Sequence, residues 1–144
     1  MFGHILVPLD GSPLAEAILP LVEELAKVHG ARVTLLRVAY AHPIPGVDPT
    51  DSQVRVIREA ETYLGEQQRA LGAKGVETSV SVRYGFPPEE IVAHAAEREV
   101  DLIAMSTHGR SGPKRWILGS VAEQVLRRAP VAVLLARAPS EPAH

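Results

Sequence analysis

Apolar residues along the chain follow two alternating patterns. Five short runs of aliphatic and β-branched residues have the length and composition of strands. They cover residues 4–9, 32–38, 76–84, 101–106 and 131–136. Between these runs, apolar residues recur every three or four positions, as on one face of an amphipathic helix. The pattern predicts helices from Pro13 to a stop at Gly30, over residues 51–73, from Pro87 onward, and over residues 120–128.

Two of the predicted helices have a clear apolar face. In the first, Ser12 is the expected N-cap and Pro13 the first helical residue. Its apolar face comprises Leu14, Ile18, Leu21, Val22, Leu25 and Val28. The helix over 51–73 has an apolar stripe formed by Val54, Ile57, Leu64 and Leu71. The segment before it, residues 39–51, contains three prolines and is expected to be a flexible loop.

The regular alternation of strands and helices predicts an α/β fold with parallel strands and right-handed crossovers. We expect one five-stranded, doubly wound, Rossmann-like sheet in the order 3-2-1-4-5, with helices on both faces. The nearly continuous apolar runs 4–9, 101–106 and 131–136 fit strands that are covered on both sides. A single domain is expected over residues 1–144, with a frayed tail at 139–144.

Composition narrows the functional classes. The chain of 144 residues has no cysteine, which excludes disulfides, thiol catalysis and cysteine-based zinc sites. A formal net charge of −2 argues against a protein that mainly grips nucleic acid, and we expect no nucleic-acid partner. No apolar run approaches the length of a membrane span, and the first residues do not resemble a secretory leader. The expectation is a cytoplasmic protein without a membrane association.

Two turns are expected to form a ligand site. In a sheet of this order, the strand order reverses between the first and fourth strands, and ligands bind there at the carboxyl ends. The first strand ends in Pro8, Leu9 and Asp10, followed by Gly11-Ser12. The fourth strand runs through Ser106 into a loop with glycines. Sequence position and topology therefore predict one crevice between these two turns.

The second loop has features of a phosphate site. Gly109, Gly112 and Gly119 allow a close approach of the backbone to a ligand, and Gly119-Ser120 opens a helix with unpaired N–H groups. Arg110, together with Lys114 and Arg115, adds positive charge. The structural alternative is that Ser120 and Glu123 form a capping box and that the basic residues only face solvent. Both interpretations of Ser120 stay open at this level.

Asp10 in the first turn also has two interpretations. It could hold a ribose hydroxyl or a metal ion bound to phosphates, but an aspartate that stabilises an Asp-Gly turn is favoured by spacing alone. His108 lies beside the glycines, yet no acid or nucleophile is spaced to make it a catalytic base, so no catalytic residue is assigned. The chain lacks the P-loop, the dinucleotide fingerprint G-x-G-x-x-G and the nucleophile elbow G-x-S-x-G. These absences argue against the corresponding ATPases, dehydrogenases and hydrolases.

With these residues in view, the sequence resembles the universal stress protein family. The resemblance rests on HILVPLDGS near the start and on MSTHGRSGPKRWILGSVAEQVLRRAPVAVLLAR in the last third. The ATP-binding branch of the family has the pattern G-x-x-G, nine residues, then G-[ST]. Gly109 is followed by nine residues and Gly119-Ser120, in agreement with the pattern. Ser106 stands where the pattern has its first glycine.

The resemblance implies a fold related to the adenine nucleotide alpha hydrolases and a site for ATP, ADP or AMP, with Mg²⁺ or Mn²⁺ bound through the nucleotide at Asp10. The expected nucleotide-binding residues are Pro8, Leu9, Asp10, Val38, Met105, Ser106, His108, Gly109, Arg110, Gly112, Gly119, Ser120 and Val121. It further implies a homodimer formed through residues 131–136. Since the sequence shows no positioned general base, we expect at most slow hydrolysis.

Two alternatives stay open beside that implication. One is a dimeric interaction protein of the same fold that uses no nucleotide, which the serine at position 106 supports. The other is an enzyme with related topology that forms AMP intermediates. Such enzymes have a serine- and glycine-rich loop after the first strand, whereas PLDGSP has a single glycine, which argues against this class.

Overall fold

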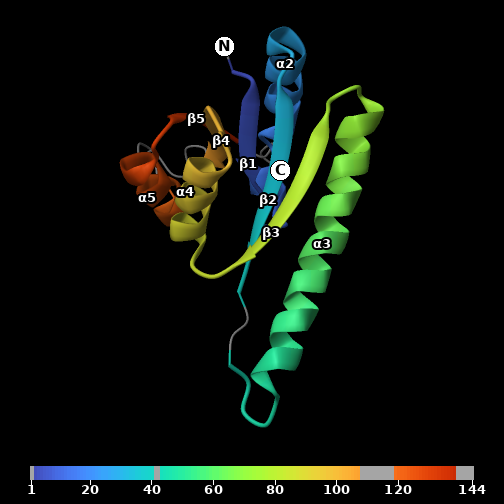
Figure 1. Cartoon of the computed structure of the whole chain (residues 1–144), viewed down its shortest axis with the longest axis vertical. Helices are drawn as coiled ribbons and strands as arrows, with labels where there is room; N and C mark the ends of the chain where they lie inside the picture. The colour runs from blue at the N-terminus through green and yellow to red at the C-terminus, as the bar shows by residue number, and fades with distance from the viewer. Residues whose placement is uncertain (1, 41–42, 108–118, 139–144) are drawn as a thin grey trace, which may run out of the picture.

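A five-stranded parallel sheet forms the centre of the molecule (Figure 1). The computed structural model describes residues 2–40, 43–107 and 119–138. The strands are β1 (His4–Pro8), β2 (Arg32–Ala39), β3 (Thr78–Tyr84), β4 (Leu102–Thr107) and β5 (Ala132–Arg137). The helices are α1 (Pro13–Glu16), α2 (Leu19–His29), α3 (Pro49–Ala73), α4 (Pro87–Glu97) and α5 (Ser120–Arg128).

The strand order is β3-β2-β1-β4-β5, which confirms the order expected from the sequence. β1 lies at the centre, where Leu6 pairs with Thr34 of β2 on one side and with Ile103 of β4 on the other. β3 and β5 form the two edges of the sheet. The reversal of strand order between β1 and β4 therefore creates the crevice that this topology uses for ligands.

Two apolar layers cover the two faces of the sheet. Ile5 and Val7 of β1 face the layer that includes residues of α2 and α3, while Leu6 faces the layer formed with α4 and α5. All three side chains are fully buried. Figure 1 shows α4 and α5 on one side of the sheet and α3 along β3. The alternation of side chains along a strand thus explains why both faces of β1 are apolar.

The helix predicted from Pro13 to Gly30 is in fact two helices. α1 ends at Glu16, and α2 starts at Leu19 with Pro20 in its first turn. Proline has no N–H, and its ring clashes with the carbonyl group four residues earlier in a continuous helix, which here is that of Glu16. The predicted stop is confirmed, because Gly30 adopts φ +63°. Val28 was wrongly placed on the buried face: its side chain is 78% exposed.

α3 begins earlier than the sequence pattern indicates. Asp48 caps it by accepting a hydrogen bond from the backbone N–H of Thr50 at 2.8 Å, so the helix starts at Pro49. Leu64 and Leu71 in its carboxyl half are buried in the layer against the sheet. The amino half extends past the end of β3 (Figure 1), and Val54 there is 43% exposed. The predicted apolar stripe is therefore correct for half of the helix.

The start of β3 also differs from the prediction. Val76 belongs to the turn that ends α3, since its N–H donates to the carbonyl oxygen of Leu71. The strand consequently begins at Thr78 instead of residue 76. Among the helices of the described residues, none combines the length and apolar character needed to cross a bilayer.

Candidate functional site

A cleft of about 360 Å³ lies at the carboxyl ends of β1, β2 and β4, against the first turn of α5. It brings together nine of the residues predicted from the sequence: Pro8, Leu9, Asp10, Val38, Met105, Ser106, Gly119, Ser120 and Val121. His108, Gly109, Arg110 and Gly112 lie outside the described residues. The crevice predicted from strand order and the observed cleft therefore coincide for the part of the site that the structure describes.

The turn after β1 is held by Asp10. Its Oδ1 accepts a hydrogen bond from the backbone N–H of Ser12 at 2.8 Å, and Gly11 between them adopts φ +89°. The Ser12 hydroxyl in turn accepts from the N–H of Ala15 at 3.1 Å and caps α1. Asp10 is thus a turn-forming residue, as the spacing favoured. Its carboxylate is also exposed and borders the cleft, so the turn fixes its position beside any ligand.

A polar network of Arg37, Tyr63 and Glu16 lies next to this turn. The guanidinium of Arg37 lies over the ring of Tyr63 at 5.3 Å, and the Tyr63 hydroxyl donates to Glu16 at 2.6 Å. Burial, followed by the hydrogen bond to Glu16, raises the pKa of Tyr63 well above its usual value, so it stays a donor. A Cβ at Gly11 would lie 2.5 Å from Arg37 Nη1. Glycine at this corner therefore allows the turn and the arginine to approach closely.

Ser106 presents an unusual polar group at the end of β4. Its Oγ is buried and has no hydrogen-bond partner among the described residues, although the residue lines the cleft. A buried hydroxyl without a partner is costly, and such groups in folded proteins are normally satisfied by protein, water or a ligand. The Ser106 hydroxyl is therefore available to a ligand with an oxygen or nitrogen atom in the cleft.

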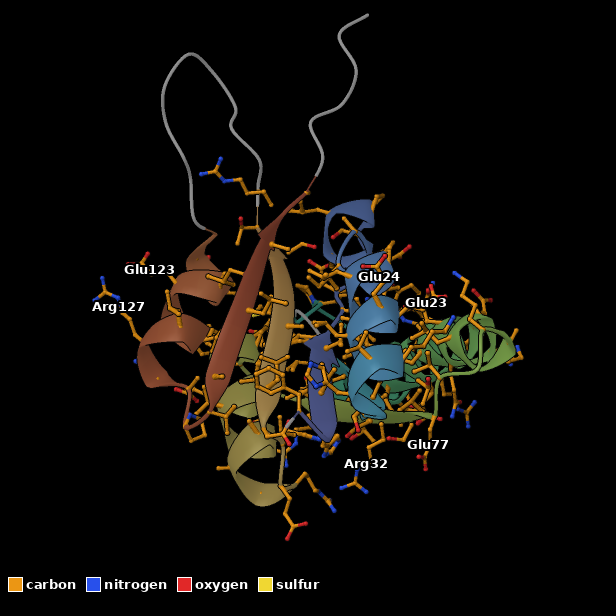
Figure 2. All side chains as sticks on the ribbon, turned by 90° about the horizontal axis from the view of Figure 1, so that it is seen from above. Glu23, Glu24, Arg32, Glu77, Glu123 and Arg127 are labelled. Carbon is orange, nitrogen blue, oxygen red and sulfur yellow. The ribbon has the colours of Figure 1, made fainter. Side chains whose placement is uncertain are left out.

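The first turn of α5 borders the same cleft without a capping side chain. Gly119 is the N-cap, with φ −62° and ψ 151°, and Ser120 is the first helical residue. The capping-box interpretation that the sequence left open is therefore wrong: Ser120 is not the N-cap, and Glu123 pairs with Arg127 at 2.8 Å on the outer face of α5 (Figure 2). The first N–H groups of a nine-residue helix, with their partial positive charge, thus adjoin the cleft.

The apolar wall of the cleft includes residues that the turn-based prediction missed. Leu36 lies on the same face of β2 as Val38, because side chains two apart on a strand share a face. Pro87 and Ile91 of α4 face them. The remaining missed residues are Ser12, Leu14, Ala15, Thr107 and Ala122. The sequence pattern predicted a helix from Pro87 onward, but only the packing of α4 over β2 places Pro87 and Ile91 at the cleft.

The described residues contain no group of three or more histidine, aspartate or glutamate side chains that could hold a metal ion. Asp10 is the only carboxylate among the described residues that line the cleft. A larger hollow of about 570 Å³ runs along α3 from Asp51 to Glu66, but residues of this one helix alone line it. The cleft at the strand ends, in contrast, joins residues from six elements and their turns.

Comparisons with known proteins agree with this architecture. The sequence model of the universal stress protein family matches residues 1–137. The chain belongs to this family. A relative, the universal stress protein MJ0531 of Methanocaldococcus jannaschii, is 30% identical over 146 residues, which cover 98% of this chain and 85% of that protein. The solved structure of MJ0577 from the same organism is similar to this universal stress protein with a TM-score of 0.82 and 29% identity, covering 98% and 99% of the two chains.

Two more distant structures contain adenine nucleotides. A universal stress protein in complex with cAMP has a TM-score of 0.74 and 20% identity to this chain, with 95% and 98% of the two chains covered. One from Archaeoglobus fulgidus in complex with dAMP has a TM-score of 0.59 and 23% identity, with 94% and 98% covered. At these identities the likeness establishes the shared fold.

Proposed function

We propose that this universal stress protein binds an adenine nucleotide, ATP or its di- or monophosphate, in the cleft as a regulatory ligand in a stress response. Three features that meet in one cleft support this most directly: an apolar wall, a helix N-terminus without a capping side chain, and the Ser106 hydroxyl, which has no partner among the described residues. A nucleotide matches these three surfaces with its base, its phosphates and its polar oxygens.

Each part of the cleft has a distinct role in the proposal. The wall of Leu36, Val38 and Ile91 receives the flat, largely apolar adenine. The exposed carboxylate of Asp10 accepts from the ribose hydroxyls or holds a Mg²⁺ or Mn²⁺ ion that accompanies the phosphates. The N–H groups at Gly119 and Ser120, with the Ser120 hydroxyl, receive the phosphates.

Hydrolysis is expected to be slow at most. A hydrolytic site needs a side chain that orients or deprotonates the attacking water within hydrogen-bond reach of the phosphates. Among the described residues that line the cleft, Asp10 is the only carboxylate, there is no histidine, and one Asp10 oxygen already accepts from Ser12. The residues therefore favour a nucleotide that acts as a bound signal over one that is turned over.

The alternative is a dimeric interaction protein that uses no nucleotide, and the serine at position 106 in place of the family's glycine is the observation in its favour. Two proteins of the same fold were solved with cAMP and dAMP, which supports nucleotide binding for this chain. Isothermal titration of the purified protein with ATP, ADP and AMP distinguishes the two functions. Absence of binding of all three at millimolar concentrations would contradict the proposal and favour the alternative.

Gly119→Val tests the position of the site. A Cβ at Gly119 meets no described atom within 4 Å, so the fold has room for the side chain, while valine at the mouth of the cleft obstructs the phosphates. We expect loss of ATP binding with an unchanged circular dichroism spectrum. Gly72→Val is the matched control, because Gly72 on α3 also has open space around it and lies outside the cleft. Normal ATP binding by Gly119→Val would place the site elsewhere.

Ser106→Ala tests the unpaired hydroxyl separately from the fold. If the Oγ contacts the nucleotide, its removal weakens binding roughly fivefold to tenfold, the value of one hydrogen bond. The same change removes a buried polar group that has no partner among the described residues, so thermal stability is kept or increased. Lower stability with unchanged affinity would instead identify a structural role for the hydroxyl.

We further propose a homodimer through β5. This strand lies at the edge of the sheet with β4 as its one strand neighbour among the described residues, which leaves one side of its backbone for pairing with a second copy. Ala132 and Arg137 at its two ends are exposed, and Leu126 of the adjacent α5 is 48% exposed. Sedimentation equilibrium at micromolar concentration is expected to give twice the chain mass, and a monomer at all concentrations would contradict the dimer.

A further inference from the structure

A second hollow, of about 410 Å³, lies at the opposite ends of the strands from the cleft. Its walls include the first residues of β1 and β2, His4 and Arg32, and the carboxyl end of α4. No residue is shared between its lining and that of the cleft. The hollow is therefore a separate feature, which the nucleotide proposal leaves unexplained.

The floor of this hollow is polar, which is unusual for the face of a covered parallel sheet. His4 Nε2 lies 2.7 Å from Thr34 Oγ1, which lies 2.9 Å from Ser79 Oγ. His4 and Thr34 are only 7% and 6% exposed. Ser81, two residues beyond Ser79 on the same strand, adds a further hydroxyl. A row of hydroxyl and imidazole groups thus replaces aliphatic side chains on β1 and β2 and continues onto the edge strand β3.

Two arginines at the rim provide positive charge. Arg32 Nη2 lies 3.5 Å from His4 Nδ1, and Arg32 projects outward from the sheet in Figure 2. Within the described residues, neither Arg32 nor Arg98 has a carboxylate within 4.0 Å. The neighbouring Arg83, in contrast, pairs with both Glu90 and Glu97. The charge of the two rim arginines is therefore available to a ligand.

His94 of α4 is the second, independent sign of a ligand. It lines the hollow with a side chain that is only 4% exposed, and its Nδ1 has no hydrogen-bond partner among the described residues. A buried ring nitrogen without a partner is as uncommon as the unpaired hydroxyl in the cleft. A polar ligand in the hollow, directly or through an ordered water, supplies the missing partner.

We propose that this hollow binds the phosphate group of a small anionic ligand between Arg32 and Arg98, with the hydroxyls of Thr34 and Ser79 and the imidazole of His94 completing the site. Arginine donates to phosphate oxygens in a planar fork, and hydroxyls add directional hydrogen bonds. The site is independent of nucleotide binding in the cleft, so either proposal can fail without the other.

The titratable groups around the two histidines define a pH dependence for this binding. Burial and the nearby Arg32 lower the pKa of His4, opposed by Asp101 and by the carbonyls of Arg98 and Glu99. Burial, then Arg83, Arg98 and His4, lowers the pKa of His94 to about 4, opposed by Glu97. A bound dianion favours the charged imidazoles and raises both pKa values. Binding of sulfate, whose charge stays constant in this range, is therefore expected to become tighter as the pH falls toward the raised pKa values.

The test follows the imidazole resonances of the full-length protein by NMR at pH 7 during titration with inorganic phosphate and, separately, with glycerol phosphate. We expect saturable shifts of the His4 and His94 rings, whereas the His29 ring at the end of α2 shows none. Stronger binding of inorganic phosphate identifies the free ion as the ligand. Stronger binding of glycerol phosphate identifies a phosphomonoester.

The Arg98→Gln and Arg32→Gln variants test whether the two rim arginines bind the phosphate. Both residues are exposed, so the fold is kept, and each variant is expected to bind either probe roughly tenfold more weakly, the effect of one charge-assisted hydrogen bond. Arg128→Gln on α5, also exposed but away from the hollow, keeps full affinity. Shifts no larger than those from chloride at equal ionic strength, or shifts unchanged in both arginine variants, would overturn the proposal.

Discussion

Acid sensitivity of the fold should depend on His94. Its folded-state pKa of about 4 lies below the ordinary value of 6.5, because burial and the cations Arg83 and Arg98 disfavour the charged ring. Below pH 6.5 the unfolded chain takes up a proton at this site that the folded chain does not. The contribution of His94 to stability is therefore present above pH 6.5 and is lost progressively down to about pH 4. Proton linkage gives a loss of about 2 kcal/mol between pH 7 and pH 5.

The His94→Gln variant isolates this contribution. It removes the titration but also some packing, so it is expected to be less stable than the parent at pH 7. From pH 7 to pH 5 the difference between the two proteins should shrink by about 2 kcal/mol, because only the parent loses the His94 contribution. Urea unfolding at both pH values, in buffers without phosphate or sulfate, measures the difference and avoids ligands of the second hollow.

Ile91→Val on the same face of α4 is the control for packing. Ile91 is 2% exposed, and the loss of one methylene lowers stability by about 1 kcal/mol at both pH values, since no titrating group changes. A constant difference between His94→Gln and the parent across the pH range would refute the reasoning. An NMR-measured pKa of the His94 ring at or above 6.5 would refute it at its first step.

Two further changes test the packing of the fold by denaturant unfolding. Gly11→Ala is expected to cost about 1–2 kcal/mol, because alanine is strained at φ +89° and its Cβ displaces the guanidinium of Arg37; an unchanged midpoint would mean that the turn relaxes freely. Leu64→Ala, at a fully buried position of α3, is expected to cost about 2–5 kcal/mol. Val54→Ala on the exposed half of the same helix is the control and should change stability by less than about 0.5 kcal/mol.

The strand order was predictable because local patterns and general topology agree. Alternating strands and helices restrict the connections to right-handed parallel crossovers, and the order follows from few remaining choices. The division of the first helix was missed because Leu14, Ile18 and Leu21 keep helical spacing across the break. Pro20 was the available signal: a proline inside an apolar helical pattern ends or kinks the helix near its preceding residues.

The candidate site was predictable where it depends on backbone turns, and less so where it depends on packing. Asp10 and Gly119 follow from turn and helix-start signals, and both border the cleft. Ile91 was not predicted at the site, because periodicity gives the face of a helix and not what that face covers. The capping-box interpretation of Ser120, which the sequence left open, was wrong by one residue, because the backbone angles make Gly119 the N-cap.

The second hollow was not predicted for the same reason: periodicity gives the face of a helix but does not show what that face covers. Pro87, Ile91, His94 and Arg98 recur on α4 at intervals of four, three and four residues, which is the ordinary spacing of a buried helix face. On the structure, the first two border the cleft and the last two border the hollow. β2 shows the same division, from Thr34 at the hollow to Val38 at the cleft. On both elements, the residues at the hollow are polar and those at the cleft are apolar. The polar end suits an anion, and the apolar end suits an adenine ring. A histidine on a buried helix face is usually a satisfied core residue. His94 differs, because its Nδ1 has no partner among the described residues and it lies beside two arginines that have no carboxylate within 4.0 Å in the described part of the chain.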